Sequence, residues 1–194
     1  MPVKLRGPGM GDMTVDKVAT ALARVEAARA AGDGASLGAA FDSAMPSGRP
    51  VPGLEAAAVA CLSDARATVR NAAAVALVDM RATAAGPALA AAACVPGVSA
   101  QCGTLVYALV ELGCRIAPGQ ALHLARHGSH EARVELVELC REGRVTPFGP
   151  EGGEDLLEDL EELAHGDDDA AYAASEVLGA LRRAGCVRGP ASVV

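Results

Sequence analysis

Histidine and cysteine are the residues of this sequence whose types could support a metal site or a nucleophile. Three of the four histidines lie close together, at His123, His127 and His130, and the first two are one helical turn apart. That spacing can place two imidazoles on one metal ion. No third ligand at zinc-type spacing accompanies them. We therefore expect these histidines to lie at a solvent-facing helix end, and we expect no metal and no other cofactor.

Sequence signatures of metalloproteases and of nucleotide binding are missing as well. The chain has no HExxH motif and no glycine-rich phosphate or dinucleotide loop. The six cysteines form no CxxC pair, and some of them, such as Cys61 and Cys140, fall on apolar helix faces. A free thiol there behaves as a small hydrophobic side chain. We expect reduced thiols, a cytoplasmic location and no enzymatic activity.

The composition is typical of an all-α protein. Hydrophobic residues make up 51% of the chain, most of them Ala, while aromatic residues make up 2% and Trp is missing. The N-terminal residues include two basic side chains but no signal-peptide core, and no apolar run approaches the roughly 20 residues that span a membrane. We expect a soluble protein without a membrane partner.

An internal repeat sets the organisation of the chain. Arg70, Cys102, Arg133 and Ala171 occupy equivalent positions, separated by 32, 31 and 38 residues. Around each of them, apolar side chains recur with the spacing of one helix face. Glu135 is the serious misfit on this inward stripe. We expect each of these four residues to lie in the first turn of a helix.

A second apolar segment precedes each of these helices, which predicts helix pairs. These segments are residues 54–62, 86–94, 118–126 and 155–164. Short polar turns separate the two helices of a pair and supply the expected N-cap residues, which are Ser63, Ser99, Ser129 and Asp167. Because a lone pair cannot bury its apolar face, the pairs are expected to stack.

The segments LSDARATVRNAAAVAL, HGSHEARVELVELC and GTLVYALVELGC resemble bacterial HEAT-repeat proteins. The resemblance covers about residues 54–184. It implies an all-α, right-handed α-solenoid of about four HEAT-like helix pairs. In such arrays a repeated Arg, here Arg70 and Arg133, supports the stack. Each of these two side chains can reach either a turn carboxylate such as Asp64 or a neighbouring repeat. The fourth pair departs from the pattern, with Ala171 where Arg is expected, which fits an atypical terminal repeat.

Four segments are expected along the chain. Residues 1–13 form a mobile N-terminus, and residues 14–53 form an N-terminal helical cap and linker, with helices near 14–31 and 36–45. Residues 54–184 form the HEAT-like repeat domain, and residues 185–194 form a mobile C-terminus.

In each predicted pair, the second helix also has a row of side chains that points away from the inward stripe. This outward stripe is the first candidate partner-binding surface. Second helices usually line the concave side of HEAT-like solenoids, and here their outward stripe grades from apolar to charged. If exposed, it is a protein-contact site; otherwise lateral packing or the N-terminal segment buries its Val positions. Its candidate residues are Asn71, Val75, Val78, Val106, Tyr107, Val110, Glu138, Arg141, Tyr172 and Glu176.

An acidic helix is the second candidate. Ten of the 24 carboxylates lie between residues 151 and 169, where there is no Lys or Arg, so the rest of the chain carries 14 acids against 17 bases. The acidic side chains form either a solvated outer face or a docking face for a basic partner. The candidates are Asp155, Glu158, Asp159 and Glu162.

These observations favour a non-enzymatic module that binds another protein. The resemblance adds an adaptor or an immunity-type inhibitor of a toxin as possible roles. The first alternative is an enzyme or lyase accessory with a small-molecule site on the concave face, which a pocket of His123, His127 and carboxylates would favour. The second alternative, nucleic-acid binding, is disfavoured because no Lys/Arg-rich strip with stacking aromatic residues appears.

Overall fold

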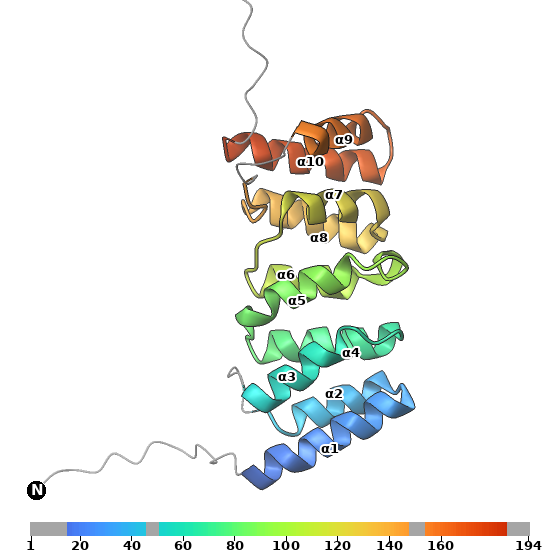
Figure 1. Cartoon of the computed structure of the whole chain (residues 1–194), viewed down its shortest axis with the longest axis vertical. Helices are drawn as coiled ribbons and strands as arrows, with labels where there is room; N and C mark the ends of the chain where they lie inside the picture. The colour runs from blue at the N-terminus through green and yellow to red at the C-terminus, as the bar shows by residue number, and fades with distance from the viewer. Residues whose placement is uncertain (1–14, 46–50, 148–153, 186–194) are drawn as a thin grey trace, which may run out of the picture.

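The structure is a computed structural model that describes residues 15–45, 51–147 and 154–185 (Figure 1). Its described residues form ten α-helices and no β-strand, so the expected all-α class is confirmed. None of these helices is both long and apolar enough to cross a membrane. The expectations for residues 1–13 and 186–194 fall outside the described residues. The helices are α1 (Val15–Ala31), α2 (Gly34–Asp42), α3 (Pro52–Cys61), α4 (Ala67–Asp79), α5 (Gly86–Ala93), α6 (Gly103–Glu111), α7 (Pro118–His127), α8 (His130–Arg141), α9 (Glu154–Ala164) and α10 (Asp169–Arg183).

Consecutive helices form pairs that stack in a single column (Figure 1). We call α2, α4, α6, α8 and α10 the second helices; each of them packs against the next one along the column. The N-terminal residues, expected to form a cap, supply α1 and α2 as a pair of their own. Since α2 packs against α4 as α4 packs against α6, this segment continues the column.

Some helices begin at the proline and N-cap residues that the sequence predicts, and others do not. Proline lies in the first turn of α3, α5 and α7, where its missing N–H costs nothing. Ser129 caps α8 as expected, because its Oγ accepts a hydrogen bond from Ala132 N at 3.2 Å. At α10 the cap is Asp168 rather than Asp167. Ser63 and Ser99 cap no helix, because the N-cap residues of α4 and α6 are Arg66 and Cys102.

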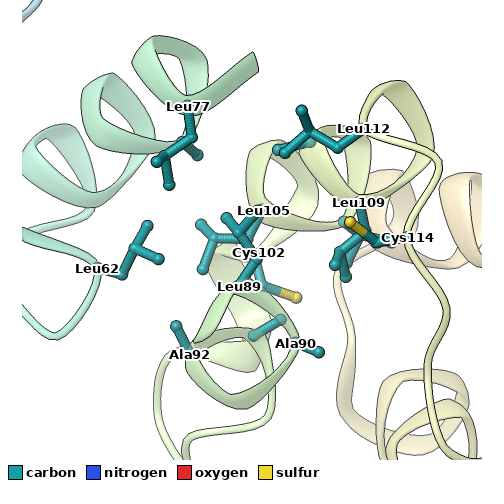
Figure 2. Close-up of a cluster of buried hydrophobic side chains, with 14 of the residues drawn as sticks. Leu62, Leu77, Leu89, Ala90, Ala92, Cys102, Leu105, Leu109, Leu112 and Cys114 are labelled. Carbon is teal, nitrogen blue, oxygen red and sulfur yellow. The ribbon is translucent and has the colours of Figure 1, made fainter. Parts of the chain in front are cut away.

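Buried Leu and Ala side chains fill the space between the layers. Figure 2 shows Leu77 of α4 near Leu89 of α5 and Leu105 of α6, all fully buried. Small residues let the backbones approach closely. At Gly86, an added Cβ would lie 2.6 Å from Cys114 Sγ, so a larger residue there would force the Cys114 side chain to shift.

Arginine side chains join the layers by binding backbone carbonyls. Arg144 Nη1 donates to Val110 O, and Arg183 Nη2 donates to Cys140 O, each at 3.2 Å. Arg70 Nη1 donates to the backbone oxygens of Asp64 and Ala65. These bonds add a donor to carbonyls at helix ends and turns, and the carbonyls of Val110 and Cys140 also accept from the backbone N–H groups of Gly113 and Gly143. The expected contact of Arg70 with the Asp64 carboxylate is therefore replaced by a contact with the Asp64 backbone.

Candidate functional site

A groove lies across α4, α6 and α8, and we call it the central groove. Its volume is about 580 Å³. No Lys or Arg lines it, whereas two carboxylates do. Its lining residues are Ala67, Asn71 and Val75 from α4, Ala100, Gln101, Gly103, Thr104 and Tyr107 from α6 and the turn before it, and Ser129, Glu131 and Glu135 from α8 and its cap.

Apolar and aromatic side chains are exposed on the wall of the central groove. Val75 is 45% exposed and Tyr107 is 41% exposed, so both predicted surface positions face solvent. Asn71 also lines the groove, and its Oδ1 is buried without a hydrogen-bond partner among the described residues. The wall therefore presents accessible apolar and aromatic area.

A second groove, the α8–α10 groove, lies beside the first and has a volume of about 510 Å³. The predicted residues Glu138, Arg141 and Tyr172 line it together, and Arg141 Nη2 donates to the Tyr172 hydroxyl at 3.1 Å. His130 Nδ1 lies 2.6 Å from Asp169 Oδ2 at the same groove. This groove carries both signs of charge, unlike the central groove.

Glu135 lines both grooves. Burial raises the pKa of its carboxyl group, and the nearby negative charges of Glu111 and Glu138 raise it further. No ion pair with Glu135 forms among the described residues. The sequence carried a signal for this residue, because Glu135 was the one serious misfit on the inward stripe. Its position between the grooves could not be read from that signal.

Nine of the ten residues predicted on the outward stripe fall into three groups. Asn71, Val75 and Tyr107 line the central groove, and Glu138, Arg141 and Tyr172 line the α8–α10 groove. Val78, Val110 and Glu176 are half-buried and line neither groove. The expectation for Val106 is wrong, because its side chain is 0% exposed.

Physical reasons for the burial of Val106 lie in the neighbouring layers. The equivalent positions in α4 and α8 are Ala74 and Val137, and both are buried too. These residues belong to helices with a second helix packed on each side. The equivalent Ser175 is exposed in α10, which packs against α8 as its only second-helix neighbour in the described chain. The outward stripe is therefore narrower than helical spacing alone predicted.

On α9, three of the four predicted acidic residues, Asp155, Glu158 and Glu162, are exposed. The fourth, Asp159, is half-buried, and its Oδ1 lies 3.4 Å from Arg126 Nη2 of α7. Glu161 Oε1 lies 3.8 Å from Arg182 Nη2 of α10. Part of the acidic charge on α9 thus faces basic side chains of neighbouring helices.

The histidine cluster divides between two places. His123 and His127 have ring centroids 4.9 Å apart, and His123 Nε2 lies 2.8 Å from the Oγ of buried Ser99. Burial lowers the pKa of His123, and His127 lowers it further. His130 instead contacts Asp169. Among residues 15–45, 51–147 and 154–185, no three His, Cys, Asp or Glu side chains are arranged to hold a metal ion.

Five cysteines fall within the described residues, and all five are free thiols. Burial raises the pKa of the Cys94 thiol to about 11 and that of the Cys140 thiol to about 12. The thiolate is the reactive form of cysteine, so these two side chains are poor nucleophiles at neutral pH. Cys186 lies outside the described residues.

Comparison of the chain with protein-family models, with curated proteins and with solved structures finds no match.

Proposed function

We propose that this chain is a non-enzymatic, HEAT-like α-solenoid that binds another protein through its second helices. The binding surface, here called the second-helix face, is the exposed part of α4, α6, α8 and α10 that contains both grooves. The two adjacent grooves, with Val75, Tyr107, Val134 and Tyr172 exposed on their walls, carry the proposal. Exposed apolar and tyrosine side chains around a groove are typical of protein-contact surfaces.

Several features favour a protein over other partners. The hydrogen bonds from arginine side chains to backbone carbonyls, together with the stacked helix pairs, are consistent with the resemblance to bacterial HEAT-repeat proteins. A nucleic acid fits poorly at the central groove, because that groove has no Lys or Arg on its walls. An intracellular adaptor or an immunity-type inhibitor remains the role we propose from that resemblance.

A small-molecule site is the second candidate function. The α8–α10 groove, at about 510 Å³, lies within the range of roughly 300–1,000 Å³ that ligand pockets occupy. His123 and His127, expected at such a site, line neither groove. Mass spectrometry of protein purified from its source organism tests this candidate, since a bound metabolite without any protein partner would favour it over protein binding.

Affinity capture from an extract of the source organism tests the leading proposal. The double variant Val75→Lys, Tyr107→Lys places positive charge on the wall of the central groove at two exposed positions. Val95→Lys is the matched control, because Val95 is 46% exposed and lines neither groove. We expect the double variant to lose one specific partner that the control retains. Identical partner lists for both folded variants would contradict the proposed surface.

A further inference from the structure

The central groove contains a carboxylate whose position is energetically unfavourable. Glu135 occupies a position of α8 that Ala72 holds in α4, Thr104 in α6 and Ala173 in α10. In these three helices, a small side chain at that position packs without charge. Glu135 is instead half-buried near Glu111 and Glu138, without an ion pair among the described residues. A charged side chain kept at a cost to stability is a common property of binding sites.

The side chains around Glu135 indicate which kind of ligand the central groove can bind. Glu131 is the other carboxylate of the central groove, and Asn71 also lines it. The groove walls carry no Lys or Arg to neutralise these acceptors. A group that brings several N–H donors and one positive charge would complement this set of acceptors.

Among cationic groups, Tyr107 favours a guanidinium group over an ammonium group as the ligand of the central groove. Its ring is exposed on the same groove as Glu135. A planar guanidinium can stack on an aromatic ring while it donates two hydrogen bonds to a carboxylate, whereas an ammonium group acts as a compact, strongly hydrated point charge. The methylene groups of an arginine would find apolar surface at Val75.

We propose that the central groove binds an arginine side chain of a partner protein, with its guanidinium group paired to Glu135 and stacked on Tyr107. This inference rests on the proposed function, because it names the chemistry that the partner presents to the second-helix face. The partner segment is therefore basic at the point of contact. Binding would relieve the repulsion that Glu135 experiences from Glu111 and Glu138.

Selection of peptides from a random library on the full-length chain tests this inference. Counter-selection on the Val75→Lys, Tyr107→Lys variant, which places repelling positive charge in the groove, retains only peptides that need the central groove. We expect these peptides to share one arginine. Synthetic versions with citrulline or lysine at that position should bind at least about tenfold more weakly, which corresponds to about 1.4 kcal/mol.

Substitution of the groove carboxylate provides the second arm of the test. Glu135→Gln should weaken the arginine peptide at least about tenfold, whereas Glu138→Gln, which changes a neighbouring acid of the α8–α10 groove, should have a much smaller effect. Groove-dependent peptides without arginine, or equal binding of the lysine version, would overturn the inference and leave the proposed function intact. Failure to select any groove-dependent peptide would count against both.

Discussion

Arg70 Nη1 donates a hydrogen bond of 2.8 Å to the backbone oxygen of Asp64, while the carboxylate of the same Asp64 binds two other arginines. Arg66 Nε lies 2.9 Å from Asp64 Oδ1, and Arg29 Nε of α1 lies 3.5 Å from Asp64 Oδ2. The turn between α3 and α4 therefore links the first pair of helices to the second. Its stability can be measured without a known partner.

Substitution of Arg70 should destabilise the chain. Its side chain is 2% exposed, and Arg70→Met leaves two turn carbonyls without their donor. Because Arg70 Nε is buried without a partner, removal of the charge offsets part of the loss. We expect the free energy of unfolding to fall by about 1–3 kcal/mol in urea denaturation.

Arg133→Met is the matched control for Arg70→Met. Arg133 holds the equivalent repeat position and donates to Ala125 O and Arg126 O, but the bond to Arg126 is exposed to solvent. We expect a smaller loss, of about 0.5–1.5 kcal/mol. A larger loss for Arg133→Met than for Arg70→Met would contradict the ranking by burial.

Asp64→Asn should remove an acid-sensitive part of the stability. The hydrogen bond from Arg66, with a smaller contribution from Arg29, holds the pKa of Asp64 well below its usual value of 3.8. Asp64 therefore stabilises the native chain above pH 3.8, and this contribution shrinks as the pH falls toward the lower native pKa. Chemical denaturation should show a difference of about 1–2 kcal/mol from wild type at pH 7 that declines between about pH 4 and pH 2.

An exposed carboxylate on α1 serves as the control for Asp64. Glu26→Gln removes one negative charge at an exposed position, so it should change the free energy of unfolding by less than about 0.5 kcal/mol at pH 7. A pH-independent effect of Asp64→Asn would show that its carboxylate is not what stabilises the turn.

Glu135→Gln should stabilise the free protein at neutral pH. The pKa of Glu135 in the native chain lies above its usual value of 4.5, so the unfolded chain loses its proton first as the pH rises. Native stability therefore falls as the pH rises from 4.5 through the native pKa, and the Gln variant avoids this loss. Thermal denaturation should show a gain of about 0.2–1 kcal/mol at pH 7 that disappears below about pH 4. A loss of stability at pH 7 would contradict unfavourable burial of the charge.

His123 should make the chain sensitive to mild acid. Its native pKa lies below the usual 6.5, so below pH 6.5 the unfolded chain takes up a proton first and native stability declines. His123→Gln retains a hydrogen-bonding group beside Ser99 but does not titrate. Denaturation midpoints should fall less between pH 7 and pH 5 for this variant than for wild type. His127→Gln, at an exposed position, is the comparison; an equal change in both variants would contradict the assignment.

The sequence predicted the helices better than it predicted the surface. Segments 86–94 and 118–126 match α5 (Gly86–Ala93) and α7 (Pro118–His127), because proline starts and apolar spacing are local signals. Val106 was misplaced because its burial depends on helices packed on both sides, which is a tertiary property. Similarly, Glu135 was recognisable as a misfit, but its place between two grooves depends on how α6, α8 and α10 pack together.

Site-specific photocrosslinking in cells of the source organism tests the second-helix face most directly. A photoreactive phenylalanine analogue at position 107 lies in the central groove, and the same analogue at position 95 lies at a similarly exposed site outside both grooves. We expect irradiation to produce a discrete covalent adduct with one partner protein at position 107 and no such adduct at position 95. No adduct at position 107, or the same adduct at both positions, would contradict binding of a protein by the second-helix face.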